Sequence, residues 1–116
     1  MISHPEGVER VVIDAGALAL SKDAGPCSVD ALMSLGTVCA ALAAAEPEPG
    51  LRLASLSQEH GVIRPVHVGG LDGRLPVGTR LRVLPNHSCL TTACHDEVHV
   101  VDDGRVTDCW QIHRRR

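Results

Sequence analysis

The chain has 116 residues and a formal net charge of −3, and Trp110 is its only aromatic residue. This length predicts one domain, residues 1–116, with a modest core of branched aliphatic side chains. The mild charge and the lack of stacking aromatics argue against nucleic-acid binding, and no stretch approaches the about 18 apolar residues of a transmembrane helix, so no membrane partner is expected.

The five cysteines and the N-terminal segment bear on the cellular compartment. An odd number of cysteines at irregular spacing argues against a disulfide framework. The N-terminus lacks the positive region and apolar run of a signal peptide, which favours a cytoplasmic location. We expect most of the cysteines to be small buried hydrophobic side chains, with Cys89 as the exception because of its neighbours.

The first half of the chain mixes strand, loop and helix signals. Residues 8–13 are rich in β-branched side chains and predict a strand, and residues 14–28 predict a loop with room for one helical turn. Residues 29–45 are ambiguous, because helical spacing and many alanines compete with Gly36 and the β-branched Thr37 and Val38. We favour a strand from Gly36 to Leu42. Residues 46–50, with two prolines and a glycine, predict a surface turn.

Short strands separated by turn residues follow in the second half. Residues 51–57, parts of residues 62–68, and residues 79–84 alternate apolar and polar side chains, and residues 69–73 predict a turn. Asp102-Asp103-Gly104 joins residues 97–101 to residues 105–112, which is a strong hairpin signal. The pattern predicts a mainly β fold, a small distorted barrel or sandwich of about six to eight strands with a short helix after Cys89.

The segment Pro85-Asn86-His87-Ser88-Cys89 carries the clearest chemistry. On extended backbone His87 and Cys89 point to the same face, so an imidazole and a thiolate can bind one cation such as Zn²⁺. A structural zinc uses four protein ligands and a reactive one keeps positions open, so the pair favours a reactive metal. A chance occurrence of the two residues in a surface turn is the alternative.

Other histidines are weaker candidates. His95 is a candidate third metal ligand, although a helical turn over residues 90–95 would use it structurally. His60 follows Glu59 and could face a substrate or support the metal site with Glu59 orienting it, or the two could hold a strand end by hydrogen bonds. A closed zinc module would instead combine His87 with the following side chains: Cys89, Cys94 and either His95 or His99.

Four stretches together resemble one family, in the order that the family uses. They are Ile13 to Asp23, Leu56 to Gly61, Val77-Gly78 leading to Leu84 to Cys89, and Trp110-Gln111-Ile112. Nearly the whole chain resembles the C-terminal β domain of the D-threonine aldolase and D-serine dehydratase family, pyridoxal-phosphate enzymes of the alanine-racemase-like fold. The resemblance implies that His87 and Cys89 bind a divalent metal, Zn²⁺ or Mn²⁺, beside the cofactor. Aldolase-type members tend to carry Asp in the second place, so Cys89 favours the dehydratase-like branch.

The resemblance also implies that these residues lack the part of the family's enzymes that binds pyridoxal phosphate. Family members hold pyridoxal phosphate on a lysine near the start of an N-terminal α/β barrel, whereas Lys22 is the only lysine here and matches the C-terminal region. We therefore expect no pyridoxal phosphate on this chain alone and no activity without a partner. In the family the metal would activate the substrate's β-hydroxyl as a leaving group.

Two kinds of partner are open. A separate chain could supply the cofactor barrel, or two copies could form a homodimer, because hairpin edges with no barrel to cover them favour association. The alternative functions are an interaction or dimerisation module from an orphan or split enzyme, and the structural zinc module.

Overall fold

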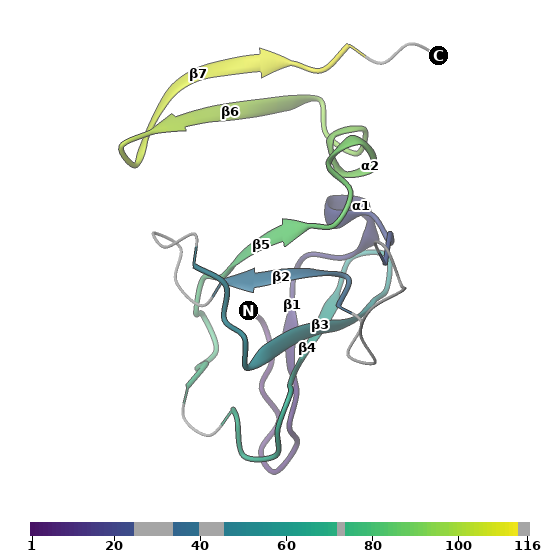
Figure 1. Ribbon diagram of the computed structural model, residues 1–116, viewed down its shortest axis with the longest axis vertical. Helices are drawn as coiled ribbons and strands as arrows, with labels where there is room; N and C mark the ends of the chain where they lie inside the picture. Colours follow the sequence, from purple (N-terminus) through teal and green to yellow (C-terminus); the bar gives the residue numbers. More distant parts are fainter. Residues whose placement is uncertain (25–33, 40–45, 72–73, 114–116) are drawn as a thin grey trace.

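The computed structural model describes residues 1–24, 34–39, 46–71 and 74–113. In these residues the chain forms seven short strands, all in antiparallel sheets, and two short helices (Figure 1). This confirms the mainly β prediction. No helix in the described part of the chain is long and apolar enough to cross a membrane.

A three-stranded sheet with the order β1-β4-β3 carries most of the core. Its strands are β1 (Val11–Ile13), β3 (Leu51–Leu56) and β4 (Gly61–Pro65). A bulge between Leu53 and Ser55 shifts the alternation, so that Leu51, Leu53 and Leu56 are all buried although their spacing is not strictly two. The bulge explains why a strictly alternating pattern does not describe this strand.

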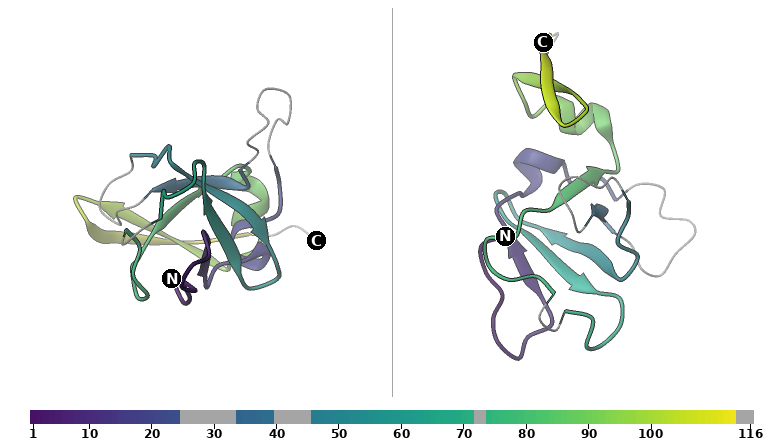
Figure 2. Two further views of the ribbon diagram at one scale, coloured as in Figure 1. Left: turned by 90° about the horizontal axis from the view of Figure 1, so that it is seen from below. Right: turned by 90° about the vertical axis from the view of Figure 1, so that its left-hand side faces the viewer.

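A second sheet pairs β2 (Gly36–Cys39) with β5 (Arg82–Pro85). The backbone N–H of Leu35 donates to the carbonyl of Leu53 over 2.9 Å, which joins the entry of β2 to β3. In the described residues the two sheets do not close into a barrel (Figure 2). Side chains of both sheets contribute to one apolar cluster. Its buried members are Val11, Ile13, Leu20, Val38, Leu51, Leu53, Leu56, Ile63, Leu71 and Leu75.

Two one-turn helices lie at one end of these sheets (Figure 1). They are α1 (Ala17–Leu20), inside the predicted 14–28 loop, and α2 (Ser88–Thr92). The extended residue before α2 is His87, with φ −134° and ψ 98°. The short helix was expected after Cys89, but it begins at Ser88, one residue before Cys89, and includes Cys89 in its first turn.

The hairpin of β6 (Glu97–Asp102) and β7 (Arg105–Gln111) lies beyond α2, away from the two sheets (Figures 1 and 2). Asp103 and Gly104 form its two-residue turn with φ 45° and 72°, which confirms the Asp-Gly prediction. All seven residues of β7 are exposed. The hairpin contributes no side chain to the apolar cluster.

Three local predictions need correction or limits. The strand Gly36–Cys39 agrees with the favoured interpretation of residues 29–45, while residues 29–33 and 40–45 lie outside the described part. The strand expected from Thr79 begins at Arg82. The expectation that most cysteines are buried is wrong, because Cys39 is buried whereas Cys89, Cys94 and Cys109 are exposed; Cys27 lies outside the described residues.

Candidate metal centre

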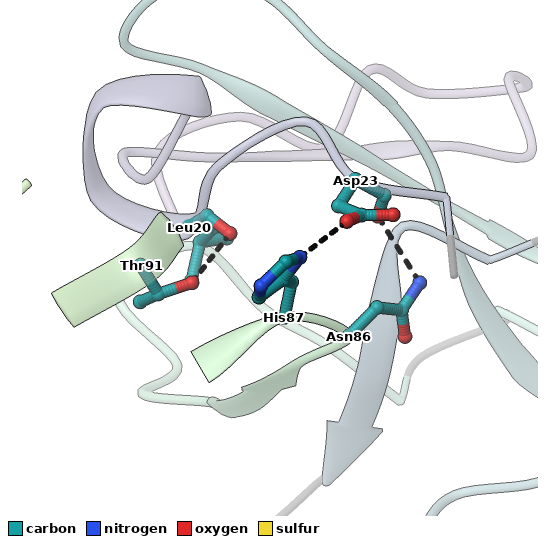
Figure 3. Close-up of polar contacts among 5 residues, drawn as sticks. All are labelled: Leu20, Asp23, Asn86, His87 and Thr91. Atoms are coloured by element: carbon teal, nitrogen blue, oxygen red, sulfur yellow. Dashed lines mark hydrogen bonds and ion pairs between the residues drawn. The ribbon is translucent and has the colours of Figure 1, made fainter. Parts of the chain in front are cut away.

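His87 sits where β5 ends and α2 begins, against the segment that follows α1 (Figure 3). The preceding residue fixes this junction, because the Asn86 side-chain amide donates to the carbonyls of Ser34, at 2.7 Å, and Asp23, at 3.2 Å. Two segments distant in sequence are thereby held beside His87. The backbone around the imidazole is positioned by hydrogen bonds that involve no side chain of the candidate metal ligands.

The His87 imidazole is oriented by a carboxylate. Its Nδ1 lies 2.6 Å from Oδ2 of Asp23, and both side chains are partly buried (Figure 3). A carboxylate accepts from a protonated nitrogen, so Nδ1 carries the proton and a neutral ring keeps its lone pair on Nε2. Histidines that bind metals are commonly oriented in this way. Asp23 therefore fits a role as the residue that orients the His87 imidazole and keeps its proton on Nδ1. The sequence alone did not reveal this contact, because the two residues lie 64 positions apart.

Cys89 is an exposed free thiol in the first turn of α2. The helix is held against α1 by two side chains: the Thr91 hydroxyl donates to the Leu20 carbonyl over 2.9 Å, and His95 Nε2 donates to the Ala19 carbonyl over 3.0 Å. His95 thus has a structural contact through one ring nitrogen, and a metal would have to use Nδ1. The contacts of α2 limit how far Cys89 can move from its place after His87.

His60 lies at the turn between β3 and β4, exposed, with Glu59 beside it. Its carbonyl accepts from the backbone N–H of Ser57 at 2.8 Å and from the Ser57 hydroxyl at 3.1 Å. Its side chain lines an open pocket of about 310 Å³ together with Glu59, Asp14 and Leu18. These contacts give the backbone a structural role and leave the predicted role of the side chain a hypothesis.

The pocket is formed by two of the motifs noted in the sequence. The backbone N–H groups of Ala17 and Leu18 donate to the carbonyls of Ser57 and Gln58 over 2.8 and 3.0 Å. Gly16 makes this approach possible, because a Cβ there would lie 2.4 Å from the Gln58 carbonyl oxygen. The motif around Gly16 and the motif around His60 are therefore in direct backbone contact.

A second group of metal-binding side chains lies on the hairpin. Donor atoms of Glu97, His99 and Cys109 are all within 4.8 Å of one another. Partial desolvation, a hydrogen bond to the Glu97 carboxylate and the charges of Glu97 and Asp108 raise the pKa of the Cys109 thiol, so without a metal the thiol stays protonated at neutral pH. This group was not predicted from the sequence, in which His99 was a candidate only for a closed zinc module.

The closed zinc module is not supported. In the described part of the chain, which includes all of its proposed ligands, Glu97, His99 and Cys109 are the sole group of three or more such side chains close enough to share an ion. His87, Cys89, Cys94 and His95 do not form such a group. Whether His87 and Cys89 share an ion as a pair stays a prediction.

Comparison with known proteins shows which family the chain belongs to. The sequence model described as "Putative serine dehydratase domain" matches residues 1–101. The chain belongs to this family. It is 34% identical over 117 residues to D-threo-3-hydroxyaspartate dehydratase of Delftia, covering 97% of this chain and 30% of that enzyme. It is 36% identical over 110 residues to the uncharacterized protein Rv1414 of Mycobacterium tuberculosis, covering 94% of this chain and 71% of that protein.

Solved structures agree with the serine dehydratase domain assignment. The Delftia dehydratase superposes with a TM-score of 0.81 at 32% identity, covering 98% of this chain and 31% of that one. An alanine racemase-like protein from Idiomarina loihiensis gives 0.79 at 37% identity, covering 95% and 29%. The domain thus spans about a third of these longer proteins. The Delftia enzyme has also been solved as a cysteine-to-alanine variant in the metal-free form and as a histidine-to-alanine variant, and the two replaced residues are two positions apart.

Proposed function

We propose that this chain is the metal-binding part of a pyridoxal-phosphate-dependent D-amino-acid lyase of the D-serine dehydratase or D-threonine aldolase type. His87 and Cys89 bind the divalent cation, Zn²⁺ or Mn²⁺, with solvent or substrate in the remaining positions. The observation that carries the proposal is the 2.6 Å contact of His87 Nδ1 with Asp23, which directs Nε2 away as the ligand. The histidine and cysteine replaced in the Delftia enzyme have the same spacing.

The donor set fits a borderline cation. A neutral imidazole and a thiolate suit Zn²⁺, and the exposed Cys89 is accessible to it. When bound, the metal would polarise a substrate β-hydroxyl. His87 holds the cation, Asp23 keeps the imidazole in the binding tautomer, and Cys89 loses its proton to bind. His60 lines the pocket at the β3–β4 turn and is assigned the role of a substrate-facing group.

Metal titration tests the assignment, in a Cys109→Ser background so that the hairpin thiol cannot contribute. Co²⁺ bound to a thiolate gives a charge-transfer absorption, so the background protein is expected to show one such site. Adding His87→Ala or Cys89→Ser should weaken binding at least about 100-fold, because each removes one of two protein ligands. Cys94→Ser is the matched control, since Cys94 is also an exposed free thiol. Unchanged affinity in both ligand variants contradicts the proposal.

The same titration also tests whether the contact of Asp23 with His87 strengthens metal binding. Asp23→Asn keeps the size of the side chain but removes the charge that favours a proton on Nδ1, and we expect affinity to fall about 10- to 100-fold. Asp102→Asn, at the exposed end of β6, is the control and should bind as the background does. Equal affinities in the two asparagine variants would reduce Asp23 to a structural partner.

The rest of the reaction is assigned to a partner. These 116 residues span 31% of the Delftia dehydratase, and their single lysine, Lys22, is exposed after α1. We therefore propose that a barrel outside these residues supplies the cofactor lysine, and a barrel-bearing partner chain is the form of this proposal that can be tested. Large apolar side chains exposed on α2 and the hairpin favour association; they are Leu90, Val101, Val106 and Trp110. Sedimentation equilibrium is expected to show a homodimer or, with the barrel chain added, a heteromer. A monomer under both conditions rejects this part.

A further inference from the structure

We propose a second metal site, formed by Glu97, His99 and Cys109 on the β6–β7 hairpin, for a borderline divalent cation such as Zn²⁺. The site shares no ligand with the His87 and Cys89 pair. The matching family model ends at residue 101 and does not include Cys109, which lies on β7. The proposal therefore stands or falls separately from the proposed function.

The strand register brings the three side chains to one face. His99 pairs directly with Cys109 across the two strands, and Glu97 precedes His99 by two residues on β6. Side chains two apart on a strand, and side chains of directly paired residues, share a face. The opposite face carries Val98 paired with Trp110. The hairpin thus has one face with metal-binding side chains and one face with apolar groups.

The register depends on a bulge. Near the turn Asp102 pairs with Arg105 and Val101 with Val106, but past the bulge Val100 pairs with Asp108. Thr107 is the extra residue, and it moves every later pairing by one position. Without it His99 would face Asp108, and Cys109 would lie on the other face. One inserted residue is what places a sulfur beside the imidazole.

The distances suit tetrahedral coordination after small side-chain movements. His99 Nε2 lies 3.7 Å from a Glu97 carboxylate oxygen, and all three donor atoms are within 4.8 Å. Ligands of a tetrahedral Zn²⁺ are roughly 3.3–3.8 Å apart, given bonds of about 2.0–2.3 Å. The three residues are exposed, so rotamer changes can close the remaining gap without moving the backbone. Sulfur, nitrogen and carboxylate oxygen are the three donor types that zinc takes in proteins.

Metal binding would also add a link between two strands that are paired along their backbones but bury no side chain of β7. A two-stranded hairpin without a core is marginally stable in water, and the described contacts give β7 no buried side chain. One ion bound by Glu97 and His99 of β6 and by Cys109 of β7 would link the strands near their open end. The fourth coordination position stays available to water or to a ligand atom from another molecule.

The test is a Co²⁺ titration of the full chain in a Cys89→Ser background, followed by thiolate charge-transfer absorption and by emission of Trp110. This residue is the only aromatic side chain and adjoins Cys109, so its emission reports on the hairpin. We expect one equivalent of Co²⁺ to bind with the thiolate band and quench the tryptophan. Zn²⁺ added afterwards should displace it.

Variants assign the ligands. Adding Cys109→Ser should abolish the thiolate band, and adding His99→Ala should weaken binding at least about tenfold. Adding Cys94→Ser, a matched exposed thiol, should change neither readout. Binding that persists unchanged without Cys109 and His99, or no thiolate band in the Cys89→Ser background, overturns the proposal. Loss of binding at His87 and Cys89 is read separately in the Cys109→Ser background, so the failure of one site is distinguishable from that of the other.

Discussion

The Leu53→Ala variant is expected to unfold with a free energy about 3–5 kcal/mol below that of the unchanged protein. Leu53 is 0% exposed in the middle of β3, and deleting its side chain leaves a cavity among aliphatic neighbours. The core has no aromatic ring that could shift to fill it. Because small domains have total stabilities of only about 5–15 kcal/mol, this single change consumes much of the total.

Urea denaturation followed by far-ultraviolet circular dichroism measures the effect, with a chelator present so that metal binding does not add to stability. Leu18→Ala is the matched control: it makes the same substitution at a side chain that is 58% exposed on α1, where alanine is a good helix former. We expect that change to stay within about 0.5 kcal/mol. Similar losses at both positions would contradict the assignment of the core.

The second large effect is expected from Gly16→Ala, about 3 kcal/mol of lost stability. The added Cβ would lie 2.4 Å from the carbonyl oxygen and 2.5 Å from the carbonyl carbon of Gln58, which belong to backbone and cannot rotate away. The segment would have to separate, and the hydrogen bonds from Ala17 and Leu18 to the β3–β4 turn would lengthen. The contact between the two motifs that line the His60 pocket would be lost with them.

Gly7→Ala is the control for this prediction. Gly7 has φ +69°, so alanine there is strained by about 1–2 kcal/mol, but no atom lies within 4 Å of the added carbon. The two variants separate conformational strain from direct collision. Both variants are measured by the same urea denaturation. If Gly16→Ala is no less stable than Gly7→Ala, the segment around Gly16 can move away from the Gln58 backbone at little cost, and the prediction is wrong.

Much of the fold could be predicted because its signals are local. Apolar residues that alternate in β4, and alternate up to the bulge in β3, mark these two strands. Asp103-Gly104 fixes the hairpin turn, since only a few residues accept positive φ at both central positions. The spacing of His87 and Cys89 favours a shared metal ion, and their role as ligands stays a prediction. The contact of His87 with Asp23 could not be predicted, because it joins residues 64 positions apart through the fold.

The hairpin cluster was missed for a different reason. Pairing outward from the Asp-Gly turn without a bulge places His99 opposite Asp108. The sequence around Thr107 has no feature that predicts a bulge at this residue. The same kind of shift at Ala54 moves Leu56 into the core. Cysteine burial failed because Cys94 and Cys109 lie on α2's end and the hairpin, where no layer covers them; composition does not report which elements remain uncovered.

The position of the hairpin outside the apolar cluster divides the chain into two levels of stability. Segments with few buried contacts open by local fluctuations far cheaper than unfolding of the whole domain. Backbone amides of β6 and β7 should therefore exchange with solvent deuterium much faster than those of β3 and β4. The C-terminal strands can melt and re-form while the sheets around Leu53 stay intact, so ordering of this tail can be controlled by whatever binds it.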